Sequence, residues 1–223
     1  MKTKKRTKRT KKSFTIALLY HYVPKDITDA YFSSEHALVD NQTDEIVNYM
    51  RLLFRKRGYK VQIIKVKPDD LSELKQLKAD FVFNLVDSKK MEVEIAKILG
   101  RLHIPYSGSS FKAIQISNNK LKTKRLFEKN ALPTPKYTII RLHDRISRNL
   151  LPGKFPIIVK PAFEHCSIGI TNKSIATTYE QFKKIVQKLR KSHNQALLAE
   201  EFIAGKELQV TVLETPTKTY ALP

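Results

Sequence analysis

The chain of 223 residues is 41% apolar and 28% charged, which indicates one large or two modest folded domains and argues against extended disorder. Its formal net charge is +21, and eight of the positive charges fall in the first twelve residues. Cys166 is the single cysteine, which excludes an intrachain disulfide and a thiolate metal cluster and is typical of a reducing cytoplasm.

Residues 1–12 form a basic tail that we expect to be disordered and to bind a polyanion such as nucleic acid weakly, through counterion release. The apolar run at 14–19 is too short for the core of an export signal, and Tyr20 and His21 interrupt it. It fits a buried first strand better. Because no apolar run is long enough to span a bilayer, we predict a cytoplasmic protein without a membrane partner.

A first domain is predicted over residues 13–112, where short apolar runs alternate with helical patterns as in a parallel sheet with crossover helices. Its predicted strands are 14–19, 61–66, 81–86 and a short piece at 104–106. A helix capped by Thr43 and ended by Gly58 lies between the first two strands. The apolar residues that share one face of this helix are Ile46, Met50, Leu53 and Phe54. A second helix at 91–99, followed by Gly100, precedes the fourth strand.

A second, α+β module follows, with a central part at 113–203 and the start of a further sheet at 204–223. It opens with a strongly basic helix at 118–130, which ends before Pro133. The remaining predicted elements are strands at 137–140, 156–160, 196–203 and 207–213 and a helix at 178–190. The fold class is therefore α/β, with a Rossmann-like parallel-sheet domain followed by an α+β domain that we expect to be incomplete at its C-terminus.

Two lysines from different elements, Lys120 and Lys160, can hold a triphosphate from two sides. Gly169 lies in the loop that follows Lys160, where a glycine permits close approach of the backbone to a ligand. Amide groups of this loop and the Ser167 hydroxyl can then face phosphate oxygens. The acidic and apolar segment 200–203 can offer backbone groups to adenine. The combination predicts an ATP site.

Each of these residues also has an ordinary structural interpretation. Lys120 is one cation of a basic helix, where a solvated face is the usual outcome, and Glu200 with Glu201 could be an edge-strand pair. Cys166 beside His165 is better explained as a small loop residue than as a nucleophile. The histidines are not spaced as zinc ligands, and nucleic-acid binding is indicated by charge alone.

From about residue 80 onward the chain resembles the ATP-grasp superfamily, and most closely its D-alanine–D-alanine ligase group. The matching segments are Phe83-Asn84-Leu85-Val86, Leu99-Gly100, Ile104-Pro105-Tyr106-Ser107-Gly108-Ser109, Asn119-Lys120, Thr123-Lys124-Arg125, Leu132-Pro133-Thr134-Pro135, Val159-Lys160-Pro161, the loop to Gly169, and 200–207. The resemblance implies four groups of ATP contacts: Lys120 and Lys160 for the phosphates, Ser167, Ile168 and Gly169 covering them, Glu200 and Glu201 with the backbone of Phe202 and Ile203 for adenine, and Glu207 for ribose.

The activity that the resemblance implies is an ATP-dependent ligation that forms a C–N bond through an acyl phosphate. Its substrates would be an amino acid or a similar small carboxylate and amine, with a role in peptidoglycan synthesis. Mg²⁺ would bridge the phosphates, and a homodimer is the family's usual state.

The chain departs from the family pattern at three places. Residues 20–24 replace a glycine-rich turn, and His165-Cys166-Ser167 replaces Gly-Ser-Ser, so the substrate stays open. After Glu207 the chain offers Glu214 as its single acid and no Asn or Arg, whereas the family takes Mg²⁺ ligands and a catalytic arginine from this region. We therefore expect the catalytic residues beyond Pro223. The chain is then a fragment of a longer ligase, or alternatively an inactive ATP-binding remnant or interaction protein.

Overall fold

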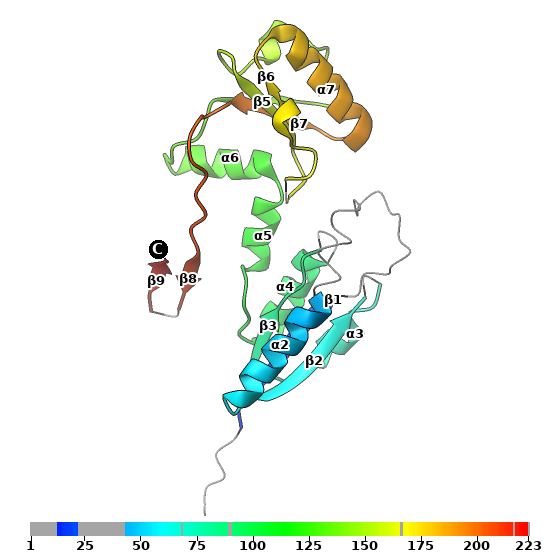
Figure 1. Cartoon of the computed structure of the whole chain (residues 1–223), viewed down its shortest axis with the longest axis vertical. Helices are drawn as coiled ribbons and strands as arrows, with labels where there is room; N and C mark the ends of the chain where they lie inside the picture. The colour runs from blue at the N-terminus through cyan, green and yellow to red at the C-terminus, as the bar shows by residue number, and fades with distance from the viewer. Residues whose placement is uncertain are drawn as a thin grey trace, which may run out of the picture. The chain divides into compact units, whose positions relative to one another are not determined.

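The computed structural model describes residues 13–21, 43–67, 69–88, 91–165, 167–215 and 217–222. The basic tail, the substituted turn after His21, Cys166 and Pro223 lie outside these ranges. The chain divides into two compact units, Met1–Asn118 and Asn119–Pro223. The predicted α/β class, with a parallel sheet in the first unit, is confirmed (Figure 1).

The first unit contains a parallel sheet of three strands in the order β2-β1-β3 (Figure 1). The strands are β1 (Thr15–His21), β2 (Lys60–Val66) and β3 (Phe81–Asn84). β1 is paired on both sides and almost completely buried, as its continuous apolar run predicts. It extends to His21, because Tyr20 and His21 continue the pairing with β2 instead of interrupting the strand. The predicted fourth strand is wrong: residues 104–106 contribute one isolated bridge, between Tyr106 and Val82.

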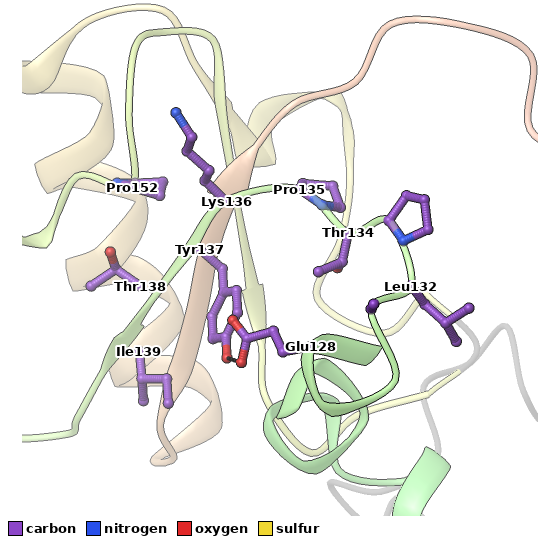
Figure 2. A pocket seen from close by; sticks show the side chains of 11 residues that line it. Glu128, Leu132, Thr134, Pro135, Lys136, Tyr137, Thr138, Ile139 and Pro152 are labelled. Carbon is purple, nitrogen blue, oxygen red and sulfur yellow. Dashed lines mark hydrogen bonds between the residues drawn. The ribbon is translucent and has the colours of Figure 1, made fainter. Parts of the chain in front are cut away.

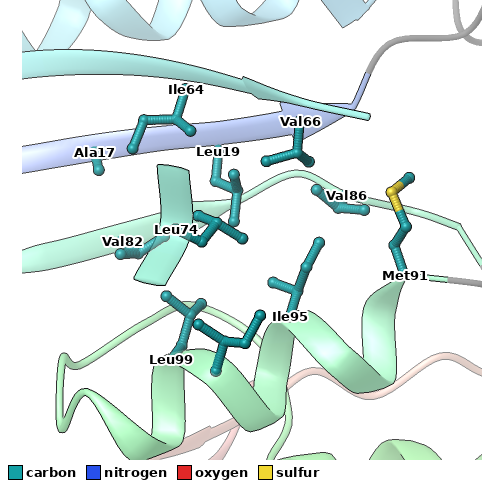
Figure 3. Close-up of a cluster of buried hydrophobic side chains, with 11 residues drawn as sticks. Ala17, Leu19, Ile64, Val66, Leu74, Val82, Val86, Met91, Ile95 and Leu99 are labelled. Atoms are coloured by element: carbon teal, nitrogen blue, oxygen red, sulfur yellow. The ribbon is translucent and has the colours of Figure 1, made fainter. Parts of the chain in front are cut away.

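The described residues of the first unit form the helices α2 (Thr43–Lys56), α3 (Ser72–Lys75), α4 (Glu92–Arg101) and α5 (Phe111–Ser117). Successive side chains of β1 point to opposite faces of the sheet. Leu18 packs with Val47 of α2 in one cluster, and Leu19 packs with residues of α3 and α4 in another. Figure 3 shows Ile95 and Leu99 of α4 directed into this second cluster.

Two details of these helices differ from the sequence-based expectation. Ile46 is 47% exposed, and its neighbour Val47 at 2% faces the sheet instead, because consecutive helical residues are rotated by about 100°. Gly100 lies inside α4 and does not end it; the left-handed residue after the helix is His103, with φ 53°. α2 begins at Thr43, whose side chain lies outside the description, and Gly58 follows its end with φ 84° as predicted.

The second unit is built on an antiparallel sheet in the order β4-β7-β5-β6. Its elements are α6 (Lys120–Lys129), β4 (Tyr137–Ile140), the 3₁₀ turn Arg148–Leu150, β5 (Ile157–Pro161), the 3₁₀ turn Asn172–Ser174, β6 (Ile175–Ala176), α7 (Tyr179–His193) and β7 (Leu197–Glu201). Thr178 caps α7 by accepting from the backbone N–H of Gln181. The helix lays Phe182, completely buried, on Val159 and Ala199 of the sheet.

The predicted strand at 207–213 is wrong over most of its length. Residues 202–211 have no regular structure, and the short β8 (Val212–Glu214) pairs with β9 (Thr219–Ala221) alone. Leu208 is 80% and Val210 60% exposed. An alternating pattern yields a long strand where neighbouring strands and a core receive it, and among the described residues nothing covers these side chains. No helix in the described ranges is long and apolar enough to cross a membrane.

Candidate nucleotide site

Lys120 is placed by the start of α6 and by one main-chain contact. The side chain of Asn119 caps the helix by accepting from the N–H groups of Leu121 and Lys122, each at 3.1 Å. The N–H of Lys120 itself donates to the carbonyl of Ala162 at 3.0 Å, just after β5 ends. Its ammonium group donates to the main-chain carbonyl of Glu164. α6 therefore delivers this lysine to the loop that follows β5.

Lys160 and Glu200 meet across two paired strands. β5 and β7 are antiparallel, with Lys160 opposite Leu198 and Ile158 opposite Glu200. The ammonium group of Lys160 forms an ion pair with Oε1 of Glu200. The Lys160 side chain is 21% exposed and that of Glu200 is 8% exposed, so the lysine is the partner that solvent or a ligand can reach. Glu200 thus pairs with Lys160 near the start of β5, where it lies opposite Ile158, whereas Lys120 contacts Ala162 and Glu164 just after β5 ends.

Lys124 also contacts Glu200, although the sequence pattern gave it no role beyond its place in a basic helix. Its Nζ lies 2.8 Å from Oε2 of Glu200, and both side chains are 8% exposed. This contact is an ion pair without directed hydrogen-bond geometry. The spacing from Lys120 is the signal that could have found it, because residues i and i+4 share one face of a helix.

The loop after β5 is tightly folded. The N–H of Ile168 donates to the carbonyl of His165 at 3.0 Å, and that of Ile170 donates to the carbonyl of Ser167 at 2.9 Å. Ser167 and Gly169 have positive φ values of 59° and 75°. Because the Ile168 amide already has a partner within the loop, that amide is not directed at a ligand in this conformation.

The segment after β7 presents its residues unequally. The N–H of Glu201 donates to the carbonyl of Lys136 and that of Phe202 to the carbonyl of Pro156, each at 3.0 Å. The carbonyl of Phe202 and the backbone of Ile203 are therefore the groups that this segment can offer to adenine. Ile203 is 67% exposed. Glu207 is exposed in the irregular stretch 202–211. Among the described residues it forms no ion pair with Lys120 or Lys160.

A cavity of about 970 Å³ lies elsewhere in the second unit, beside the edge strand β4. Figure 2 shows Glu128 and Tyr137 close together on one side of it and Pro152 and Lys136 on another. None of the predicted ATP residues lines this cavity. The cavity borders Lys124, because its lining residues Thr134 and Pro135 accept hydrogen bonds from the ammonium group of Lys124.

The side chains in the described part of the chain do not form a site that fits Mg²⁺. Among these residues no three His, Cys, Asp or Glu side chains gather where they could hold a metal ion. Glu200, the buried acid at the site, already faces two lysines. No step through a metal is assigned to these residues.

The sequence and fold both have known relatives. A family model described as the D-ala D-ala ligase C-terminus matches residues 126–222. The D-alanine–D-alanine ligase of Halalkalibacterium halodurans is 30% identical over 172 residues, which cover 76% of this chain and 55% of that protein. The ligase of Pelagibacter ubique is 34% identical over 169 residues, covering 71% and 52%. The chain is D-alanine–D-alanine ligase-like.

Solved structures extend the likeness of this ligase-like chain to the fold. D-alanyl-alanine synthetase A from Vibrio cholerae superposes with a TM-score of 0.67 at 20% identity, covering 95% of this chain and 66% of that one. The Bacillus anthracis D-alanine–D-alanine ligase complexed with ATP gives 0.65 at 19% identity, covering 94% and 70%. The chain spans about half the length of the curated relatives it matches. The family-model match includes Lys160 and Glu207 and begins after Lys120.

Proposed function

We propose that this chain provides the nucleotide-binding part of an ATP-dependent carboxylate–amine ligase that resembles D-alanine–D-alanine ligase. One observation carries the proposal: Lys120, forty residues before Lys160 in sequence, donates its N–H to the carbonyl of Ala162, only two residues after Lys160. Two cations supplied by a helix and a strand whose main chains lie side by side suit a polyphosphate, whose oxygens accept several charge-assisted hydrogen bonds.

Within this proposal the residues divide the nucleotide between them. Lys120 and Lys160 bind phosphate oxygens, and Ser167, Ile168 and Gly169 cover them. Adenine lies against 200–203, where the carbonyl of Phe202 and the backbone of Ile203 are the available groups. Glu207 binds ribose, for which the segment 202–211 has to bring it toward the lysines. Lys160 has to leave Glu200 in order to reach a phosphate.

The proposed reaction is the joining of a carboxylate to an amine. A substrate carboxylate takes the terminal phosphoryl group to form an acyl phosphate, and an amine then displaces phosphate to form the C–N bond. The names of the relatives point to D-alanine as the first substrate to test. Positioning and charge neutralisation are what a protein supplies to such a transfer, and the two lysines supply both.

A second candidate function is nucleotide binding without turnover. The absence of a grouped metal donor set in the described residues favours it for this chain by itself. Phosphate release separates the two candidates. Release that requires Mg²⁺ and rises with D-alanine supports the ligase, whereas ATP binding without any release supports the second candidate.

The site is tested by calorimetric titration with ATP. We expect Lys120→Ala and Lys160→Ala each to weaken ATP binding by about tenfold or more, because each removes a charge-assisted hydrogen bond of roughly 1.5–3 kcal/mol. Lys188→Ala, on the exposed side of α7, is the matched control and leaves the affinity unchanged. Parent-like affinity in both site variants would show that the nucleotide site lies elsewhere.

A further inference from the structure

The ammonium group of Lys124 is surrounded by protein atoms. Besides the Glu200 carboxylate at 2.8 Å, its ammonium donates to the hydroxyl of Thr134 at 2.6 Å and to the carbonyl of Pro135 at 3.1 Å. It also lies 5.1 Å from the ring centroid of Tyr137. An ammonium group has three N–H donors, and three oxygen atoms surround this one. The ammonium group of Lys124 is therefore enclosed by protein oxygens, with two hydrogen bonds and one ion pair, and is poorly placed to bind a ligand.

Lys160 differs from Lys124 in the number of its partners and in its exposure. Its single partner among the described residues is Oε1 of Glu200, and its side chain is 21% exposed against 8% for Lys124. Glu200 thus receives one cation at each oxygen. Of the two, Lys160 can be exchanged and Lys124 cannot.

Lys124 affects the free energy that is needed to separate Lys160 from Glu200. A buried carboxylate that loses all cationic partners is strongly destabilised, so a Glu200 paired with Lys160 alone would retain that lysine. With Lys124 in place, Glu200 keeps a cation when Lys160 turns away. The two lysines also share one net negative charge, so the hold of Glu200 on Lys160 is weaker than in an isolated pair.

We propose that Lys124 is a positioning residue that keeps Glu200 neutralised and so releases Lys160 for the phosphates of a nucleotide. The nucleotide half of this statement rests on the proposed function. The release of Lys160 does not, because it is a property of the chain without any ligand.

The first test therefore uses no nucleotide. The folded chain is acetylated under limiting reagent, and the labelling of Lys160 is measured by mass spectrometry relative to the exposed Lys188. In Lys124→Met we expect labelling of Lys160 to fall at least about threefold, since Glu200 then has one remaining cation. Lys124→Arg, which keeps the charge, retains most of the parent labelling. Lys124→Met combined with Glu200→Gln restores it, because the carboxylate that held Lys160 is gone.

Unchanged labelling of Lys160 in folded Lys124→Met overturns the proposal. If Lys124→Met does not fold, Glu200→Gln alone decides: we expect Lys160 labelling to rise above the parent, and no rise shows that Glu200 does not hold this lysine. Circular dichroism establishes folding for each variant.

The second test compares ATP with adenosine by calorimetric titration. Lys124→Met lowers the ratio of ATP to adenosine affinity by about tenfold, the loss expected when one phosphate cation is withdrawn. Adding Lys160→Met to Lys124→Met then lowers this affinity ratio little further, whereas Lys160→Met alone lowers it by the full factor of about ten. A merely structural role would weaken both ligands equally and leave the ratio unchanged, which contradicts the proposal. A parent that binds neither ligand refutes the proposed function, and the labelling result still decides the role of Lys124.

Discussion

Gly169 approaches His193 so closely that a Cβ atom at position 169 would lie 2.7 Å from Nε2 of the imidazole ring. The same Cβ would lie 2.8 Å from Cγ of Pro161. The φ value of 75° adds a second restriction, because it lies in the left-handed region that residues with a Cβ adopt at a cost. The loop that we place over the phosphates therefore depends on glycine for two separate reasons.

Gly169→Ala should lower the free energy of unfolding by about 1–3 kcal/mol, from backbone strain and displacement of His193 together. Urea denaturation measures this loss. Gly205→Ala is the control, since a Cβ there meets nothing within 4 Å and the residue has no positive φ. His193→Ala added to Gly169→Ala should recover part of the loss. Equal stability of the two single alanine variants would show that position 169 tolerates a side chain.

Phe182 is the largest completely buried side chain of the chain's second unit, packed between α7 and the sheet. Phe182→Ala should destabilise that unit by about 3–5 kcal/mol, through lost burial and the cavity left behind. Leu126→Ala, at a side chain that is 41% exposed, should change stability by less than about 0.5 kcal/mol.

Hydrogen exchange would measure how far the destabilisation by Phe182→Ala extends through the chain. The cluster around Phe182 shares no residue with the clusters on either face of β1. Amides of β5 and β7 should therefore lose protection while those of β1 keep theirs. Equal loss of protection in both units would contradict the separation of the two cores.

Tyr137 should ionise at a higher pH than an ordinary tyrosine. Burial raises its pKa from the usual 10.0, and the hydrogen bond that its hydroxyl donates to Glu128 at 2.9 Å raises it further, while Arg125 opposes both. Because the folded-state pKa exceeds the unfolded one, the neutral phenol stabilises the fold below pH 10 and this contribution is lost as the pH rises through the folded pKa.

The alkaline titration is followed through the ring carbons of labelled tyrosine, with Tyr137→Phe identifying the signal. Glu128→Gln should lower the pKa of Tyr137, since it removes the carboxylate charge and leaves the burial unchanged. A Tyr137 signal that titrates at or below pH 10.0 in the parent would show that the hydroxyl is more solvated than in this structure.

The elements that could be predicted from sequence are those whose own residues settle the outcome. β4 lies where its pattern predicts, and α7 starts directly after its threonine cap. The predicted strand at 207–213 failed because its pairing depends on neighbours that sequence alone does not supply. The short α3 and α5 were missed, since four and seven residues give too little periodicity to recognise.

The same distinction applies to the candidate site. Lys120 and Lys160 could be selected through the order of short motifs, and the main chain of Lys120 lies beside Ala162, two residues after Lys160. Lys124 received no role of its own because basic helix faces are usually exposed, and its burial depends on Glu200, a partner seventy-six residues away. The i, i+4 spacing places Lys124 on the helix face of Lys120, but the distant acid that pairs with it cannot be identified from the helix sequence.

Residue 120 is anchored to Ala162 through main-chain atoms, so its position does not depend on which side chain it carries. A relative in which this lysine has been replaced would keep the same helix start and the same loop contact. Superposition would then rate the two proteins as equivalent although one of them had lost a cation from its site. For chains of this kind, whether the nucleotide site has survived has to be decided from the side chain at this position, and similarity of the backbone gives no warning of its loss.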